Sequence, residues 1–247
     1  MQGSRVRSGS GPLSALLELL LPRACVGCGR DGIAWCSECL AVELEPVLHV
    51  PDPCPAGLPR LAAAAAYSAS VRLAILAAKE RDRRELDRTL GAMLAAAVGR
   101  LIAADPTWPD RCGSLWLVPV PASATAMRER GRDHVGDWTR WAVRWLHDTQ
   151  VMASLVPALR RNSEGRDSVG LDARQRAANL RGVFAARRIE APPPGTTVII
   201  VDDIVTTGAT LVAASGCLGE RLDLDPQDIG AAVVAATQRH PAPVTPT

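Results

Sequence analysis

The segment Val198-Ile-Ile-Val-Asp-Asp-Ile-Val-Thr-Thr-Gly-Ala-Thr-Leu211 decides the fold of this chain. Its continuous apolar run predicts a buried strand that ends at two acids, Asp202 and Asp203. A turn rich in hydroxyl groups and glycine follows, and it opens a predicted helix. Amide groups at a helix N-terminus, together with the helix dipole, bind anionic phosphate. The segment therefore predicts a phosphate site between a strand and a helix.

The side chains of this turn suit a phosphorylated sugar. Thr206, Thr207 and Thr210 supply hydroxyl donors, and Gly208 lets the backbone approach a phosphate. Acids beside a phosphate must accept hydrogen bonds from another group, and ribose hydroxyls or a Mg²⁺ ion held through water meet that need. The chain has neither the G-x-x-x-x-G-K-[ST] pattern of a P-loop nor the glycine spacing of a dinucleotide fingerprint. An aspartyl-phosphate site and an accidental strand–turn–helix are the alternatives.

The rest of the chain alternates helical and strand patterns, which is typical of an α/β fold with a parallel sheet and crossover helices. We expect helices over 70–80, 86–104, 133–147 and 208–221, and strands over 115–120, 155–159, 197–201 and 229–236. Five prolines between residues 46 and 60 predict a linker. The expected organisation is a disordered tail and amphipathic helix (1–22), a four-cysteine module with its proline-rich linker (23–55), an α/β domain (56–238) and a disordered tail (239–247).

Composition excludes several classes of protein. Of the 247 residues, 47% are apolar and 22% charged, which is typical of a globular protein and not of a disordered one. The net charge is only +2, so any basic surface must be local. No apolar run approaches the roughly 18–20 residues of a membrane span, and the leucines between 13 and 21 fit a helical face better than a signal peptide. The cysteines are crowded rather than spread in pairs, so we expect a cytoplasmic protein.

Four cysteines form the pattern C-x2-C-x7-C-x2-C, in the pairs Cys25–Cys28 and Cys36–Cys39. Two intervening residues allow a tight turn, helped by Gly27, to point both sulfurs of a pair at one ion. Tetrahedral coordination by four thiolates suits Zn²⁺ best and iron second. Because four cysteines leave no open coordination position, the module is predicted to be structural. Free thiols or a redox pair are the alternative.

Two further segments carry candidate binding residues. Lys79 is the only lysine of the chain and follows an apolar helix, so it is either an ammonium required by a site or an ordinary cation at a helix C-terminus. The sequence Pro119-Val120-Pro121-Ala122-Ser123 ends the strand over 115–120. Ligands lie beyond the carboxyl ends of parallel strands, so this loop should face the phosphate turn. Prolines that merely end an edge strand are the alternative.

Arg160 and Arg161 begin an arginine-rich stretch that runs to residue 188. A solvated basic face is one interpretation, and a surface for single-stranded nucleic acid is another. We expect only weak binding of single-stranded DNA, because the net charge is +2 and aromatic residues make up 3% of the chain.

Trp138, Trp141 and Trp145 recur at helical spacing. Such a stripe predicts packing against the core or against a second subunit rather than base stacking, which leaves a homodimer open. His134 precedes this stripe in a charged run and is a candidate to approach the site, whereas the other histidines are expected on the surface.

The segment 198–211 closely resembles the phosphoribosyl diphosphate (PRPP) signature of type I phosphoribosyltransferases. From the cysteine module to about residue 237, the chain further resembles the ComF family of competence-related phosphoribosyltransferase-like proteins. The likeness rests on an ordered set of pieces: the four cysteines, Lys79-Glu-Arg81, Leu117-Val-Pro-Val-Pro121, Arg128-Glu-Arg-Gly-Arg-Asp-His134, Gly170-Leu171, Arg176-Ala-Ala-Asn-Leu180, Gly182-Val-Phe184 and the PRPP signature.

This resemblance implies a type I phosphoribosyltransferase fold preceded by a small zinc-binding module, and it implies roles for the candidate residues. Asp202 and Asp203 would hold the ribose hydroxyls, and Thr206, Thr207, Gly208, Ala209 and Thr210 would wrap the 5′-phosphate. The loop from Pro119 to Ser123 would bind pyrophosphate, and Lys79, Asp202 and Asp203 would act in catalysis. Arg160 and Arg161 would belong to a mobile loop that closes over the pyrophosphate. Asp82 stands where the family often has glycine, so the turn there is expected to differ.

Two functions are compatible with these residues. An enzyme would transfer a phosphoribosyl group from Mg-PRPP to an unknown nitrogen acceptor, with Mg²⁺ and cations stabilising the leaving pyrophosphate. The alternative is a non-catalytic accessory of DNA uptake that binds PRPP or a related nucleotide and contacts a helicase or single-stranded DNA. The expected cofactors are structural Zn²⁺ and, with PRPP, Mg²⁺.

Overall fold

The segment that decides the fold forms β7 (Thr196–Val205) in the interior of a six-stranded sheet with the order β1-β2-β8-β7-β3-β4. The computed structural model describes residues 24–105, 114–162, 182–225 and 228–237. Five strands pair in parallel and β1 is antiparallel to β2. The bounds of the other five strands are β1 (Val47–Leu48), β2 (Arg60–Ala66), β3 (Ser114–Pro119), β4 (Ala153–Leu155) and β8 (Ile229–Ala236).

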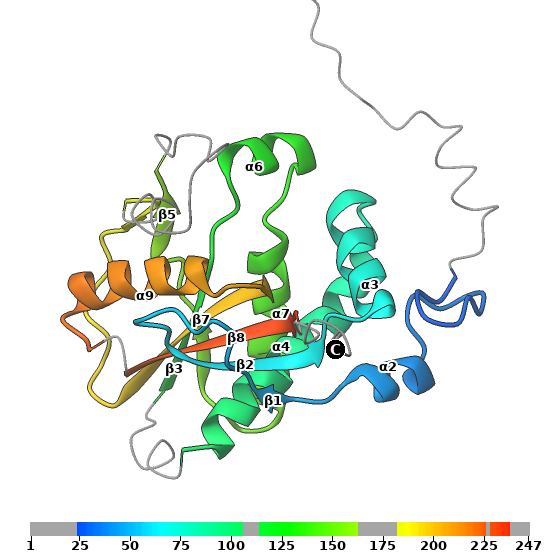
Figure 1. The fold of residues 1–247 in the computed structure, drawn as a ribbon, viewed down its shortest axis with the longest axis horizontal. Coiled ribbons are helices and arrows are strands. Elements are labelled where there is room, and N and C mark those ends of the chain that lie inside the picture. Colours follow the sequence, from blue (N-terminus) through cyan, green and yellow to red (C-terminus); the bar gives the residue numbers. More distant parts are fainter. Residues whose placement is uncertain (1–23, 106–113, 163–181, 226–227, 238–247) are drawn as a thin grey trace, which may run out of the picture.

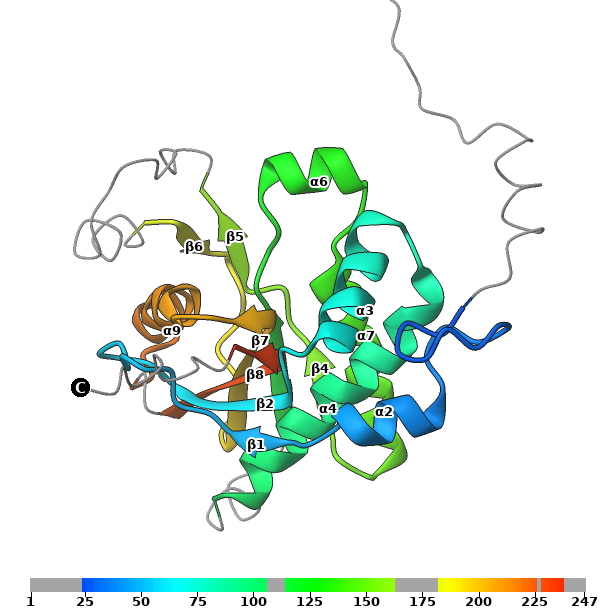
Figure 2. The same ribbon diagram turned by 45° about the vertical axis from the view of Figure 1, so that its right-hand side comes forward.

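Helices cover both faces of this sheet (Figure 1). In the second view, α9 lies on one side of the sheet, and α3, α4 and α7 lie on the other (Figure 2). A separate pair of antiparallel strands is formed by β5 (Leu159–Arg161) and β6 (Phe184–Ala186). The predicted α/β fold with a mostly parallel sheet and flanking helices is therefore confirmed. The helices are α2 (Ser37–Glu43), α3 (Ala69–Glu80), the 3-10 turn η1 (Arg84–Leu86), α4 (Asp87–Ala103), α6 (Ala124–Arg130), α7 (His134–Asp148) and α9 (Ala209–Leu222).

Alternate residues of β7 face different layers of the core. Ile199 and Val201 belong to the apolar cluster that includes residues of α3, α4 and α7. Val198 and Ile200 belong to the other cluster, which includes residues of α9. Successive side chains of a strand point to opposite faces. Near the end of β7 this alternation shifts by one residue, since Ile204 packs against the α3/α4/α7 cluster and Val205 belongs to the α9 cluster.

The alanine-rich run after residue 60 forms β2, a strand that the sequence analysis does not predict. Alanine has low strand propensity, so the run carries no local strand signal. Ala62 and Ala64 pack in the α3/α4/α7 cluster and Ala63 packs in the α9 cluster. Tertiary cover on both faces, not local preference, therefore makes this segment a strand. Within the predicted linker over 46–60, β1 pairs with β2 at the edge of the sheet.

The strand expected over 155–159 is wrong in its extent. The structure has β4 and β5 instead, in two different sheets. Pro157 lies between them, and proline cannot donate a hydrogen bond to a ladder, so the chain leaves the main sheet here.

Several predictions lie outside the described residues: the tail and helix over 1–22, the tail over 239–247, and most of the arginine-rich stretch, including Gly170-Leu171 and Arg176–Leu180. Within the described ranges, no helix is long and apolar enough to cross a membrane.

The crossing of α4 and α7 depends on Gly91. A Cβ atom at this position would lie 2.3 Å from Cβ of Trp141 and 2.7 Å from the carbonyl oxygen of Trp138. We expect Gly91→Ala to lower the free energy of unfolding by about 3 kcal/mol or more, because neither helix can give way without repacking. Gly99→Ala is the matched control in the same helix, because its Cβ would meet nothing within 4 Å.

The control is expected to raise the free energy of unfolding by about 0.5–1 kcal/mol, since alanine loses less backbone entropy than glycine in a helix. Urea unfolding measures both. Equal effects of the two variants would contradict the packing argument.

Candidate functional site

The two acids lie inside β7, not after it as predicted from the sequence. The ladder with β3 ends at the pair Pro119–Val201, followed by a hydrogen bond from the Val120 amide to the Val201 carbonyl (2.9 Å). The ladder with β8 continues through Asp202 to Val205. The strand is therefore longer than its apolar run, because β8 pairs with it to the end. The last residues of β7 therefore pair with β8 on one side but not with β3 on the other. The chain that follows β3 leaves the sheet beside the two acids.

The acids face different layers of the molecule. Asp203 lies on the same face of β7 as Ile199 and Val201, the face covered by α3, α4 and α7. Asp202 lies on the same face of β7 as Val198 and Ile200, the face covered by α9. A single strand thus presents one carboxylate to each side of the sheet.

Asp203 joins two other predicted residues. Nζ of Lys79, in the last turn of α3, donates a hydrogen bond to Oδ2 of Asp203, and Nε2 of His134 lies 3.4 Å from the same oxygen. Oδ1 accepts the amide of Ile204 at 2.6 Å. The side chains of Lys79, Asp203 and His134 are only 17%, 14% and 5% exposed. The structure therefore brings a partly buried cation and acid together with a buried imidazole at the carboxyl end of β7.

The surroundings give the two acids different proton affinities. Burial raises the pKa of Asp203, but the hydrogen bond from His134 and the charge of Lys79 outweigh it and hold this pKa well below its ordinary value. Burial and the negative charge of Asp203 raise the pKa of Asp202 well above its ordinary value. Asp203 is therefore the more acidic member of the pair.

His134 is held rigidly at the first turn of α7. The N-cap residue Asp133 accepts a hydrogen bond from the Gly136 amide (3.2 Å) and so fixes the start of the helix. The imidazole packs edge-on against Trp138, with ring centroids 5.2 Å apart. The sequence marks His134 only as a candidate, and its place in the charged run before α7 is the signal that singles it out.

The same charged run connects three helices. Arg132 forms ion pairs with Asp87 (2.5 Å) and Asp137 (2.8 Å), and Asp87 also accepts the indole N–H of Trp138 at 2.7 Å. Arg130 pairs with Glu80 at the end of α3 (2.8 Å). These contacts link α3 and α4 to the chain entering α7, and they hold the elements that carry Lys79 and His134. Of the tryptophan stripe, Trp138 is fully buried, whereas Trp141 and Trp145 are half-buried with the guanidinium of Arg88 over their rings.

The turn over 206–210 lies between β7 and α9. Thr206 and Thr207 are exposed, and Oγ1 of Thr207 accepts the amide of Ala209 at 3.4 Å. Gly208 is buried with φ +76°, and a Cβ there would lie 2.6 Å from Cδ1 of Leu58. Glycine is therefore required for its backbone angle and for its close approach to the segment before β2. Thr210 lies in the first turn of α9 and is half-buried.

The predicted pyrophosphate loop begins where β3 separates from β7, and it runs from Pro119 through Val120, Pro121 and Ala122 to Ser123. Val120 is buried, and the following three residues are half-buried. Oγ of Ser123 accepts the amide of Ala126 (3.1 Å) and caps α6. Because β3 lies between β7 and β4, the prolines do not end an edge strand.

The predicted mobile-loop arginines lie on β5, outside the acidic cluster. Nη1 of Arg160 donates to Oδ1 of Asn162 (3.0 Å), and the guanidinium of Arg161 stacks over Phe184 at 5.4 Å. Within the part of the chain that the structure describes, neither arginine forms an ion pair with Asp202 or Asp203.

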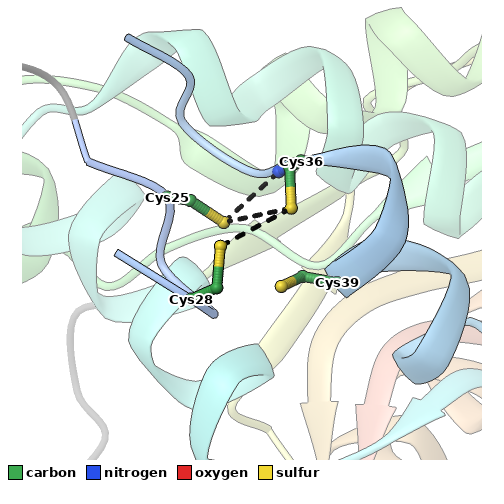
Figure 3. Close-up of side chains that lie close together, drawn as sticks. All are labelled: Cys25, Cys28, Cys36 and Cys39. Atoms are coloured by element: carbon green, nitrogen blue, oxygen red, sulfur yellow. Dashed lines mark hydrogen bonds between the residues drawn. The ribbon is translucent and has the colours of Figure 1, made fainter. Parts of the chain in front are cut away.

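The four cysteines form a second candidate site (Figure 3). Their sulfur atoms all lie within 4.8 Å of one another, with Cys36 Sγ 3.7 Å from Cys25 Sγ and 3.8 Å from Cys28 Sγ. These separations are far longer than a disulfide bond of about 2.05 Å. They match the edge of about 3.8 Å expected for a tetrahedron with zinc–sulfur bonds of about 2.3 Å. The cluster can therefore bind a metal ion such as zinc.

Backbone hydrogen bonds favour a thiolate at Cys25. Cys25 Sγ accepts the amides of Cys36 (3.3 Å) and Gly27 (3.4 Å). Burial raises the pKa of the Cys25 thiol, but backbone hydrogen bonds outweigh it and lower this pKa to about 6. A Cβ at Gly27 would lie 2.8 Å from both Cβ and Sγ of Cys39, so glycine leaves the space for the fourth sulfur.

The cysteine module packs against the main domain. Trp35, Cys25 and Cys36 belong to the same apolar cluster as the residues of α3 and α4. Glu43 at the end of α2 accepts hydrogen bonds from the hydroxyls of Ser68 (2.7 Å) and Ser70 at the start of α3. The module and α3 are thus connected by apolar and polar contacts.

A shallow apolar groove of about 480 Å³ lies elsewhere, between the C-terminal halves of α4 and α7. His134 and the acids are at the opposite end of α7, about 20 Å away for a helix of this length. The groove is lined by alanines and larger apolar side chains and contains no charged side chain, so it offers no catalytic chemistry.

Comparison of the chain with protein-family models and with curated proteins finds no match.

Proposed function

We propose that the protein binds PRPP and acts as a phosphoribosyltransferase-like protein of the ComF kind. The observation that carries this proposal is the assembly of two carboxylates, a partly buried lysine and a hydroxyl-rich turn at the carboxyl end of β7. Ligands of open α/β sheets bind at this end of the strands. A phosphorylated ribose requires acceptors for its hydroxyls and donors for its phosphate, and both are present within the segment from Asp202 to Thr210.

The 5′-phosphate would occupy the turn over 206–210. The exposed hydroxyls of Thr206 and Thr207 and the first amides of α9 are donors, and Gly208 lets the backbone approach. The carboxylates of the acidic pair would accept hydrogen bonds from the ribose hydroxyls. The diphosphate would lie toward the loop after β3, which leaves the sheet beside the acids.

Transfer of the phosphoribosyl group breaks the bond between ribose C1 and the diphosphate. Negative charge grows on the departing pyrophosphate, and the Lys79 ammonium, which pairs with Asp203, is a cation placed to stabilise it. Bound Mg²⁺ would add to this charge stabilisation. The proposed acceptor is a nitrogen nucleophile.

Isothermal calorimetry with PRPP, with and without Mg²⁺, tests the proposal. We expect saturable binding at one site, tighter with Mg²⁺ because the metal offsets the diphosphate charge. Ribose 5-phosphate and pyrophosphate should each compete with PRPP. An absence of binding at millimolar PRPP would contradict the proposal, and binding without transfer to any nitrogen acceptor would favour the non-catalytic accessory.

We further propose that the cysteine cluster holds Zn²⁺ in a structural role. Sulfur separations of 3.7 and 3.8 Å and the donor set of four thiolates support this assignment. All four cysteines are consumed as ligands, so no position is left for a reacting molecule.

A further inference from the structure

The carboxylate of Asp203 already accepts several hydrogen bonds from groups of the protein itself. Oδ2 meets both Lys79 and His134, and Oδ1 accepts the amide of Ile204. A carboxylate has about four acceptor positions, so only about one remains for a ligand. Asp202, by contrast, accepts the amide of Asp203 at 2.8 Å and takes part in no ion pair within the described ranges.

We propose that the acidic pair is divided in function: Asp202 meets the ligand hydroxyls, whereas Asp203 is a positioning residue that, held by His134, places the Lys79 ammonium for the diphosphate. This inference rests on the proposed function. It follows from the surroundings of the two acids: Asp202 pairs with Val233, which belongs to the α9 cluster, whereas Asp203 contacts Lys79 of α3 and His134 of α7.

Lys79 needs such a partner. Its charge is carried by a flexible four-carbon stem at the end of α3, and an untethered ammonium would sample many positions. An ammonium has three donors, so one bond to Asp203 leaves two for phosphate oxygens. Asp203 can therefore position Lys79 while the lysine binds the diphosphate.

His134 is built to hold Asp203. The ring is nearly buried and packs on Trp138, and its Nδ1 is a buried atom without a hydrogen-bond partner in the described structure. Its one hydrogen-bond contact is therefore the one that Nε2 makes with Asp203. An ionised carboxylate can only accept, so Nε2 donates.

Calorimetry with Mg-pyrophosphate and with ribose 5-phosphate, measured separately, tests whether the two acids differ in function. We expect His134→Leu to weaken binding of Mg-pyrophosphate about five- to tenfold, the loss of one hydrogen bond to a charged group, and to leave ribose 5-phosphate within about twofold. His134→Gln should restore most of the affinity, because its amide can donate to Asp203. Asp202→Asn should show the reverse pattern and weaken ribose 5-phosphate about tenfold. His147→Leu, at the far end of α7, is the matched control and should change neither affinity.

Two results would overturn the proposal. One is a loss of ribose 5-phosphate binding in Asp203→Asn as large as in Asp202→Asn, with pyrophosphate binding intact. The other is a His134→Gln variant as impaired as His134→Leu. If the wild type binds neither ligand, the proposed function fails, and thermal unfolding still tests the positioning contact. The melting-temperature changes of His134→Leu and Asp203→Asn should then be non-additive, and additive changes would rule the contact out.

Discussion

Replacement of both Asp202 and Asp203 by asparagine is expected to abolish measurable PRPP binding. Asparagine keeps the size of the side chain but removes its charge and half of its acceptor capacity. Each lost charge-assisted hydrogen bond should cost about 1.5–3 kcal/mol, which is roughly tenfold or more in affinity for each residue. Calorimetry measures this loss, with Asp148→Asn as the control because Asp148 is an exposed acid at the far end of α7.

The fold should persist in this double variant, although it should melt at a lower temperature. The melting temperature should fall because Asp203 is the ion-pair partner of the partly buried Lys79. Removing one partner leaves the other charge uncompensated, which is more costly than losing an exposed pair. Unchanged PRPP affinity in a folded double variant would refute the ribose assignment.

Removal of the metal is expected to have the second large effect. We expect about one zinc ion per purified chain, and chelation should disorder the cysteine module because folding and thiolate ligation are coupled. Since Trp35 and two of the cysteines share a core with α3 and α4, the melting temperature of the whole protein should fall as well. Elemental analysis and hydrogen exchange of residues 25–44 measure the two effects.

Cys36→Ser should reproduce the chelated state, because Cys36 lies within 3.8 Å of two other sulfurs. Cys54→Ser is the matched control, since Cys54 is exposed and outside the cluster. Protein purified under reducing conditions without any bound metal would contradict this prediction.

Patterns along the sequence predict much of the fold. The apolar run of β7 and the 3.6-residue periodicity of α4 and α7 depend on local spacing, and these elements occur close to where they are expected. The strand β2 is not predicted, because its alanines form a strand only where other residues pack on both faces. The short α2 and α6 are also missed, since helices of 7 residues leave too few repeats for a periodicity to be visible.

The candidate site is only partly predictable for a different reason. Local patterns identify Lys79, His134 and Asp203 separately, but 124 residues separate Lys79 from Asp203, and 69 separate His134 from it. Their meeting depends on which face of the sheet each helix covers. The alternation of side chains along β7 is the one sequence signal that places the two acids on different faces. This signal can be used only if the strand is known to continue through both acids.

The unequal ends of β3 and β7 have a consequence for how such a protein can change over time. The pairing of β7 with β8 continues through the acids to Val205 and fixes their register. The pairing of β7 with β3 ends earlier, at Val201, so the chain after β3 is not held by the sheet. Insertions or exchanges in the loop after β3 therefore need not shift the register of β7. Under the proposed function, a lineage can vary its acceptor while the strand that carries the acids stays unaltered, since loops carried on a fixed scaffold tolerate such change.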